Sequence, residues 1–100
     1  MARMKYRILL ASEAIQDLKR LPAHDRVQVR DAIEEHLRHQ PTRVSKSRIK
    51  RLRGLAKPGY RLRIGDLRVF YDVTKTEVHV LTIIRKPEAE RWLAEEGERS

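Results

Sequence analysis

The segment GYRLRIGDLRVFYDV, residues 59–73, constrains the fold of this 100-residue chain more than any other feature. Alternating residues flank Gly65-Asp66, and a Gly-Asp pair suits the two-residue turn of a β-hairpin. Because successive side chains of a strand point to opposite faces, one face of this hairpin is apolar. That face consists of Tyr60, Leu62, Ile64, Leu67, Val69 and Tyr71. The hairpin is therefore predicted to cover a hydrophobic core with one of its two faces.

The second face of the hairpin is cationic. It carries Arg61, Arg63, Arg68 and Phe70, with Arg63 opposite Arg68 and Arg61 opposite Phe70. Like charges that face each other destabilise a sheet on the scale of cross-strand pairs, roughly 0.2–1 kcal/mol. An anionic ligand would offset this repulsion through charge-assisted hydrogen bonds. Alternatively, the arginines pair with nearby carboxylates or extend into water, so the sequence leaves both interpretations open.

A second hairpin extends this arginine face. A turn at Lys75-Thr76 sets a register in which Arg68 pairs with Ile83, and Arg85 then emerges on the same face. The same register pairs Val73 with Val78, Asp72 with His79 and Phe70 with Leu81. Lys86 points the other way, unless a β-bulge near the end of the strand exchanges Arg85 and Lys86.

Trp92 belongs to a short helix that is expected to begin at Pro87. One interpretation places its indole at the edge of the arginine face, where it would stack on a nucleic-acid base. The other makes it an apolar anchor that holds the helix against the body of the protein. The residues around Trp92 do not decide between the two, so both stay open.

Hydrophobic periodicity and turn residues place the remaining elements. We expect strands over 6–11, 49–55, 60–64, 67–73 and 78–84, and helices over 12–21, 23–40 and 87–96. The fold class is therefore α+β: an N-terminal strand and an α-helical hairpin pack on a mainly antiparallel, twisted sheet of about four to five strands, followed by a short C-terminal helix. A chain of this length forms a single domain, residues 1–100.

Positive charge is concentrated in one part of the chain. The net charge is +9, yet no Asp or Glu occurs between His36 and Gly65. That stretch contains ten of the 23 lysines and arginines, at positions 38, 43, 46, 48, 50, 51, 53, 57, 61 and 63. Such a block is typical of a surface that binds a polyanion such as nucleic acid. The alternative is a solvated basic surface without a ligand.

Other classes of chemistry have little support. The chain contains no cysteine, which excludes disulfides and thiolate catalysis. It has no run of about 18 apolar residues, so we expect no membrane span and a cytoplasmic protein. Its four histidines lack metal-ligand spacing and no glycine-rich phosphate loop is present, so we expect neither a metal nor a cofactor.

Three of these segments resemble the RelE/ParE toxin superfamily of type II toxin–antitoxin systems, and its RelE-like branch in particular. They are YRLRIGDLRVFYDV (60–73), IKRLRG (49–54) and LTIIRKPEAERW (81–92). The resemblance implies a toxin that a cognate antitoxin neutralises in a heterodimer or heterotetramer. For RelE-like members it implies metal-independent cleavage of mRNA on the ribosome, in which the 2′-hydroxyl attacks the adjacent phosphate and translation is inhibited.

The resemblance also assigns roles to residues. Arg61 and Arg63 match two positions that are lysine in the best-known RelE branch, and Arg68 matches a phosphate-binding arginine. Arg85 or Lys86 matches a basic residue at the end of the last strand, which completes the catalytic candidates. The substrate-binding candidates are Trp92, in the place of a stacking tyrosine, together with Phe70, Lys50, Arg51 and Arg53.

Two departures from the family pattern keep other functions open. Arginine stays protonated and is a poor general base, yet it occupies both lysine positions. Trp92 has no phenol group to exchange a proton. A ParE-like inhibitor of DNA gyrase and a catalytically degenerate RNA-binding domain are therefore the alternatives to an endoribonuclease.

Overall fold

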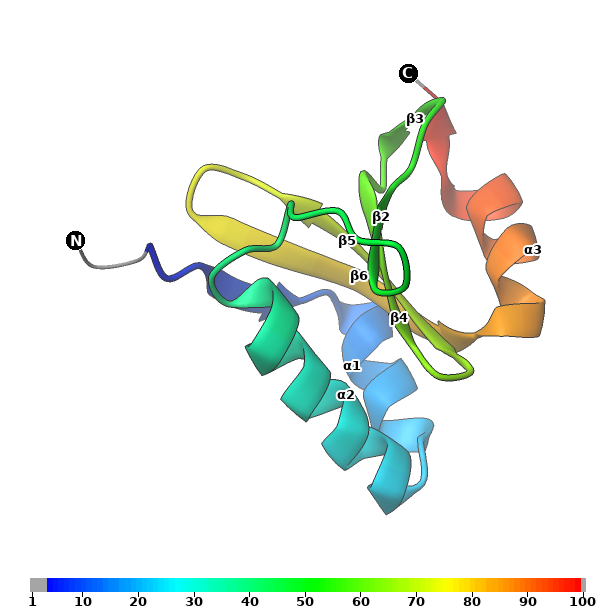
Figure 1. Cartoon of the computed structure of the whole chain (residues 1–100). Helices are drawn as coiled ribbons and strands as arrows, with labels where there is room; N and C mark the ends of the chain where they lie inside the picture. Colours follow the sequence, from blue (N-terminus) through cyan, green and yellow to red (C-terminus); the bar gives the residue numbers. More distant parts are fainter. Residues whose placement is uncertain (1–3, 100) are drawn as a thin grey trace.

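Ten short elements make up the computed structural model, which describes residues 4–99 (Figure 1). In chain order they are β1 Arg7–Leu10, α1 Ser12–Arg20, α2 Ala23–Leu37, β2 Ile49–Arg51, β3 Leu55–Lys57, β4 Tyr60–Ile64, β5 Leu67–Val73, β6 Glu77–Arg85, α3 Lys86–Glu96 and β7 Glu98–Arg99. The prediction of one strand over 49–55 is wrong. The chain turns at Gly54, whose φ of +79° favours glycine, and this turn separates β2 from β3.

A five-stranded sheet forms the centre of the fold, in the order β1-β6-β5-β4-β2. β1 runs parallel to its neighbour β6, and the other neighbouring strands are antiparallel. The helices α1 and α2 form a hairpin on one side of this sheet (Figure 1). The predicted α+β class is confirmed.

The core lies between the helical hairpin and the sheet. α1 contributes Ala14 and Leu18, and α2 contributes Val29, Ile33 and Leu37. The sheet contributes Leu62, Ile64, Leu67, Val69, Tyr71, Val78, Val80 and Ile83, with Tyr60 partly buried against them. The apolar face predicted for the first hairpin is thus the face that meets the helices.

The first hairpin has the predicted register. Arg63 lies opposite Arg68, and Arg61 lies opposite Phe70. Gly65 adopts a φ of +55°, which glycine reaches without the steric cost that a Cβ atom imposes. The turn therefore lies at Gly65-Asp66 as predicted, and the structure contains the predicted like-charged pair of Arg63 and Arg68.

The second hairpin departs from prediction at one point. The pairs nearest the turn agree with it: Val73 with Val78 and Asp72 with His79. Further along, Phe70 pairs with Thr82 instead of Leu81, and Arg68 pairs with Ile84, one residue later than predicted. Leu81 is thus the extra residue of a β-bulge. Because an extra residue exchanges the two faces of a strand, the later side chains of β6 lie on the face opposite to the predicted one.

A partly buried carboxylate holds α1 to β6 just beyond the bulge. Asp17 Oδ2 accepts hydrogen bonds from the Thr82 hydroxyl at 2.6 Å and from the backbone N–H of Ile83 at 3.0 Å. Thr82 is fully buried, so its hydroxyl would be costly to leave unpaired. This contact fixes the helical hairpin to the bulged part of the strand.

α3 lies on the side of the sheet away from the helical hairpin (Figure 1). Its Trp92 ring stacks on Phe70 of β5, with 5.2 Å between ring centroids. After the helix, β7 pairs with β3 in a separate two-stranded sheet. α3 therefore covers part of the arginine face.

Tyr71 brings a hydroxyl group into the core. The residue is fully buried, and its hydroxyl donates to the backbone oxygen of Pro41 at 2.6 Å. The bond ties the segment after α2 to the central strand β5. Burial raises the pKa of Tyr71, and the neighbouring Tyr60 adds to the shift, so the native state holds the phenol in its neutral form.

We expect Tyr71→Phe to lower the free energy of unfolding by about 1–3 kcal/mol at neutral pH, because the buried Pro41 oxygen loses its donor. Urea denaturation followed by circular dichroism measures the difference. Tyr60→Phe is the matched control, since Tyr60 stacks on Tyr71 at 5.5 Å but is only half-buried. Equal losses in the two variants would contradict a role for the Tyr71 hydroxyl bond.

The same pair of proteins gives a prediction for alkaline pH. A raised pKa means that the native state favours the protonated phenol, so this contribution to stability is complete below about pH 10, the ordinary tyrosine pKa, and decreases as the pH rises above it. Phenylalanine cannot ionise. The stability difference between wild type and Tyr71→Phe should therefore shrink above about pH 10, and a constant difference would contradict the prediction.

Candidate functional site

A cleft lies between the arginine face of the sheet and α3, and we call it the basic cleft. Its volume is about 590 Å³. The cationic residues that line it are Lys50 from β2, Arg61 from β4, Arg68 from β5 and Lys86 at the start of α3. Its other lining residues are Leu52, Phe70, Pro87, Ala89, Glu90 and Leu93. Four cations around one cavity, with apolar side chains between them, suit a ligand that is both anionic and partly apolar.

Arg68 is held rigidly in this cleft. Only 6% of the residue is exposed, and its Nη1 donates to the backbone oxygens of Gly65 at 2.8 Å and Leu67 at 2.9 Å. Burial lowers the pKa of Arg68, and Arg63 lowers it further, against an opposing effect of Asp66. One corner of the guanidinium group is therefore bonded to the hairpin turn, which fixes its position before any ligand binds.

Arg61 is half-buried beside Arg68 and lacks one hydrogen-bond partner. Its Nε is inaccessible to solvent and has no acceptor within residues 4–99. Burial lowers the pKa of Arg61, and the charges of Arg68 and Arg63 lower it further. Buried donors in proteins are almost always paired. Arg61 and Arg68 line one cleft and form no ion pair with a carboxylate within residues 4–99, and this favours the anion-binding interpretation of this face over the solvated one.

The bulge in β6 decides between Arg85 and Lys86. Arg85 lies on the helix side of the sheet, where Nη2 is 2.8 Å from Asp25 Oδ2 and Nη1 is 3.6 Å from Asp66 Oδ2. The hydrogen bond with Asp25 is the largest cause of its raised pKa. The prediction that Arg85 emerges on the arginine face is wrong, because the extra residue Leu81 exchanges the faces. Lys86 lines the basic cleft in its place.

The remaining cationic candidates lie outside the cleft. Arg63 is exposed next to it. Arg51 donates from Nη1 to the Gly59 oxygen at 2.7 Å, and its guanidinium carbon lies 5.1 Å from the centre of the Tyr60 ring. Arg53 is exposed in the turn between β2 and β3. Of the four basic or aromatic side chains predicted to bind substrate alongside Trp92, only Lys50 and Phe70 reach the cleft.

Trp92 acts as an anchor in this structure. Its ring is nearly parallel to that of Phe70, with an interplanar angle of 8°, and its Nε1 donates to Glu13 Oε1 at 3.1 Å. Phe70 is only 1% exposed as a result. The anchor interpretation therefore describes the position of Trp92, and the stacking of either ring on a base stays a prediction.

Comparison with known proteins identifies the family. Residues 8–89 match the family described as the ParE toxin of the type II toxin–antitoxin system parDE. The chain belongs to this toxin family. A search among curated protein sequences gives no match.

Solved structures confirm the RelE/ParE fold of this toxin. The RelBE2 toxin–antitoxin complex of Mycobacterium tuberculosis is similar, with 24% identity and a TM-score of 0.69 over 85% of this chain and 95% of that chain. So is the archaeal RelE–RelB complex of Pyrococcus horikoshii OT3, with 26% identity, a TM-score of 0.61 and coverage of 83% and 97%. The isolated Escherichia coli RelE toxin has 20% identity, a TM-score of 0.63 and coverage of 86% and 94%.

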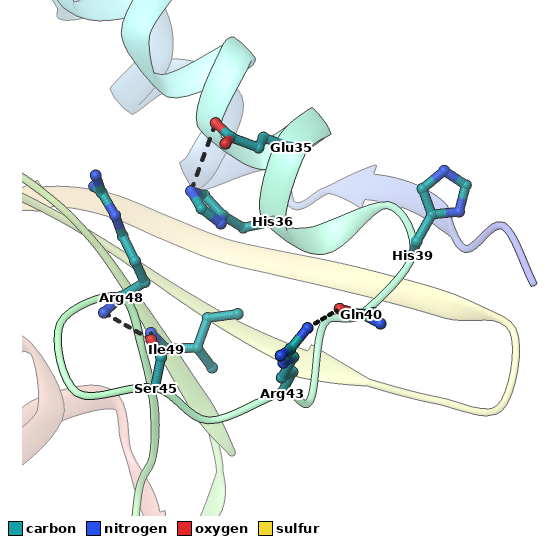
Figure 2. Close-up of a pocket in the computed structure, with 8 residues that line it drawn as sticks. All are labelled: Glu35, His36, His39, Gln40, Arg43, Ser45, Arg48 and Ile49. Carbon is teal, nitrogen blue, oxygen red and sulfur yellow. Dashed lines mark hydrogen bonds and ion pairs between the residues drawn. The ribbon is translucent and has the colours of Figure 1, made fainter. Parts of the chain in front are cut away.

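The toxin has a second hollow on the helix side of β2, with a volume of about 320 Å³ (Figure 2). Ile49 lines it, whereas the adjacent Lys50 lines the basic cleft, so the two cavities lie on opposite faces of one strand. Most of its polar groups already have partners within the hollow: His36 pairs with Glu35, Arg43 with Gln40, and Ser45 with the backbone N–H groups of Arg48 and Ile49. The basic cleft is therefore the stronger candidate for a binding site.

Two other kinds of site find no support in residues 4–99 of the toxin. No three His, Cys, Asp or Glu side chains of this part of the chain gather as a metal site would require. Within the same residues, no helix has both the length and the apolar character that crossing a membrane demands.

Sequence reasoning named Lys86 and Trp92 of α3 but missed Ala89, Glu90 and Leu93, which also line the cleft. Lys86, Ala89, Glu90 and Leu93 all line the cavity. Their spacing of three and four residues places them on one face of a helix. This pattern was available in the sequence, but the position of the helix at the edge of the arginine face was only one of the two interpretations left open.

We expect substitutions of the adjacent residues Arg85 and Lys86 to have different effects on stability and on RNA binding. Arg85→Ala should lower the free energy of unfolding by up to about 1 kcal/mol, because it removes a partly exposed ion pair, and should leave RNA binding unchanged. Lys86→Ala should leave stability unchanged and weaken binding to single-stranded poly(U). The slope of log affinity against log salt concentration should fall by about 0.7 for one lost phosphate contact. The reverse pattern would contradict the positions described here.

Proposed function

We propose that this toxin is an endoribonuclease that binds the phosphate backbone of mRNA in the basic cleft and cleaves it on the ribosome, so that translation is inhibited. The observation that carries the proposal is the pair of Arg61 and Arg68, two partly buried cations that line one cleft and form no ion pair with a carboxylate within the described residues. A phosphate bound by the two guanidinium groups that line the cleft would relieve the repulsion between them. RNA supplies such a phosphate next to an internal nucleophile, the 2′-hydroxyl.

The cations of the cleft suit the charge that develops in this reaction. When the 2′-oxygen attacks, negative charge increases on the non-bridging oxygens of the phosphate. Arg68 is fixed to the hairpin turn, so its charge needs no reorganisation during the reaction. We assign Arg68 and Arg61 to the scissile phosphate and Lys86 to the leaving 5′-oxygen, as proton donor or second clamp. The reaction needs no metal ion in this scheme.

The cations outside the cleft suit the surface of a ribosome. Arg63, Arg51 and Arg53 are exposed around the arginine face. The segment from residue 43 to 57 supplies further lysines and arginines without an intervening acid. Contacts of this kind position a protein on RNA but read little sequence. We assign them to ribosomal RNA, which also places the toxin in the cytoplasm.

We also propose that an antitoxin protein binds this toxin. The support is the family, which is one of toxin–antitoxin systems, and the similarity to RelE chains that were solved in complexes with RelB antitoxins.

Inhibition of DNA gyrase is the second candidate function. The family match, which is to ParE toxins, favours it. The arginines on β4 also favour it, because a gyrase inhibitor needs no proton acceptor on that strand. A supercoiling assay with purified gyrase, run beside the RNA assay below, separates the two candidates.

We expect the wild-type toxin to cleave mRNA on programmed ribosomes whose A site is empty, and Arg68→Ala to lose roughly 10²–10³-fold in single-turnover rate, the usual effect of removing one preorganised charge. Primer extension on the mRNA locates and quantifies the cuts. Arg20→Ala on α1 is the control, since this exposed arginine does not line the cleft. Unfolding curves must show that Arg68→Ala is folded.

The outcomes assign the function. Cuts that Arg68→Ala loses and Arg20→Ala keeps support the endoribonuclease. Ribosome binding without cuts, by a folded wild-type protein, would contradict catalysis and indicate a degenerate RNA-binding domain. Inhibition of supercoiling without ribosome binding would assign the toxin to gyrase.

A further inference from the structure

The cationic residues of the basic cleft do not account for one step of the proposed reaction, the removal of the proton from the 2′-hydroxyl. Attack by the 2′-hydroxyl requires a group that accepts its proton. Arginine and lysine side chains are hydrogen-bond donors in their charged forms and have no acceptor atom. Lys50, Arg61, Arg68 and Lys86 therefore stabilise charge in the cleft, but none of them accepts a proton while it remains charged.

Glu90 supplies the missing kind of group. Among the residues that the structure describes, it is the only acidic residue that lines the basic cleft. A carboxylate is ionised at neutral pH and acts purely as an acceptor. Glu90 therefore lines the same cavity as the cations that would hold the phosphate.

The structure fixes the helix that carries Glu90 at both ends. At its start, the backbone N–H of Lys86 donates to the Asp66 oxygen at 2.8 Å. Trp92 holds its middle through Phe70 and Glu13, and β7 pairs with β3 just beyond its end. Glu90 thus belongs to an anchored wall of the cleft that faces the sheet with its arginines.

The carboxylate of Glu90 is not used as a partner for those cations. Within residues 4–99 it forms no ion pair, which means that no lysine or arginine nitrogen lies within the 4.0 Å limit for such a pair. Glu90 is exposed, so its carboxylate remains open to a ligand in the cleft. The separation leaves a cavity of about 590 Å³ between the helix and the sheet. A phosphodiester and its ribose fit a space of this kind.

We propose that Glu90 is the general base of the RNA cleavage reaction, an inference that rests on the proposed function. Glu90 takes the proton of the 2′-hydroxyl as the 2′-oxygen forms its bond to phosphorus. The bond from phosphorus to the 5′-oxygen breaks, and Lys86 donates a proton to that oxygen. The products are a 2′,3′-cyclic phosphate and a 5′-hydroxyl, with no net gain or loss of protons in the RNA.

The spacing of Glu90 and Lys86 supports this assignment. They are four residues apart on α3, which places them on the same helix face about 6 Å apart along its axis. Two long side chains at this separation are able to reach the attacking and the leaving oxygen on opposite sides of one phosphorus atom. Acceptor and donor are then carried by one helix, and the arginines that bind the phosphate by the facing strands.

The test is single-turnover cleavage of mRNA on programmed ribosomes by wild type, Glu90→Gln and Glu95→Gln, from about pH 6 to pH 8.5, a range below the usual titration of lysine and arginine. Glu95 is the control because it is exposed on the same helix and does not line the cleft. The charged groups that line the cleft with Glu90 are present in all three proteins: Lys50, Arg61 and Arg68 on the facing strands and Lys86 on the same helix. Ribosome binding is measured in parallel.

We expect Glu90→Gln to lose roughly 10²–10⁴-fold in rate, the usual contribution of general base catalysis, while it still binds ribosomes. The wild-type rate should be nearly flat over this range, because a side chain takes the proton and hydroxide is not needed. The rate of Glu90→Gln should increase with pH, because hydroxide must replace the lost base. Glu95→Gln should behave as wild type, and Glu90→Asp should recover part of the rate.

Each other outcome overturns the assignment in a distinguishable way. A Glu90→Gln variant that cleaves at the wild-type rate, or faster because a negative charge is removed from an RNA-binding cleft, would leave the endoribonuclease in place and exclude Glu90 as its base. A slower variant with an unchanged pH profile would show that Glu90 only positions other groups. A wild-type protein that binds ribosomes without cutting RNA would remove the proposed function together with this inference.

Discussion

The β-bulge at Leu81 is the constraint on which the rest of the site depends. One extra residue exchanges the faces of β6, so Arg85 meets Asp25 of the helical hairpin instead of joining the arginines of the cleft. The same exchange brings Lys86 to the cleft and starts α3 on the arginine side of the sheet. Asp17 secures the bulge, because it binds Thr82 and Ile83 directly after the extra residue.

An arginine face with one opposed pair, Arg63 and Arg68, is compatible with a stable fold because its cost is small and local. A like-charged cross-strand pair costs at most about 1 kcal/mol, whereas small domains are stable by roughly 5–15 kcal/mol. The apolar face of the same hairpin contributes to the hydrophobic core, whose burial offsets this cost. When an anion enters the cleft, the repulsion is relieved, and that relief adds to the free energy of binding. The arginines are thus unfavourable for the empty protein and favourable for the complex.

The parts of this structure that the sequence predicts are those that local rules determine. A Gly-Asp turn and strict alternation define the register of the first hairpin, and with it the core face and the opposed pair of Arg63 and Arg68. The bulge is not determined locally, since Leu81 lies in an unbroken run of β-branched and apolar residues that fits either register. Its position depends on the contact of Asp17 with β6, between residues far apart in the chain. The prediction for Arg85 was wrong because the extra residue Leu81 was not predicted.

The same distinction explains why Glu90 escaped notice. Its helix was predicted, but the surface that the helix covers depends on the bulge, on the stack of Trp92 with Phe70 and on the pairing of β3 with β7. None of these contacts is local in sequence.

Arginine at positions 61 and 63 has a consequence for where proton transfer can occur. A lysine on that strand could act as an acceptor once it had lost its proton, whereas arginine remains charged. The strands can then bind and stabilise anionic charge throughout the reaction, and a proton acceptor has to come from another element. α3 is the element that lies across the cleft, and it carries a carboxylate and a lysine on one face. The contacts that dock α3 would therefore control the chemistry as well as the shape of the cleft, because moving this helix displaces both groups together from the arginines on the sheet.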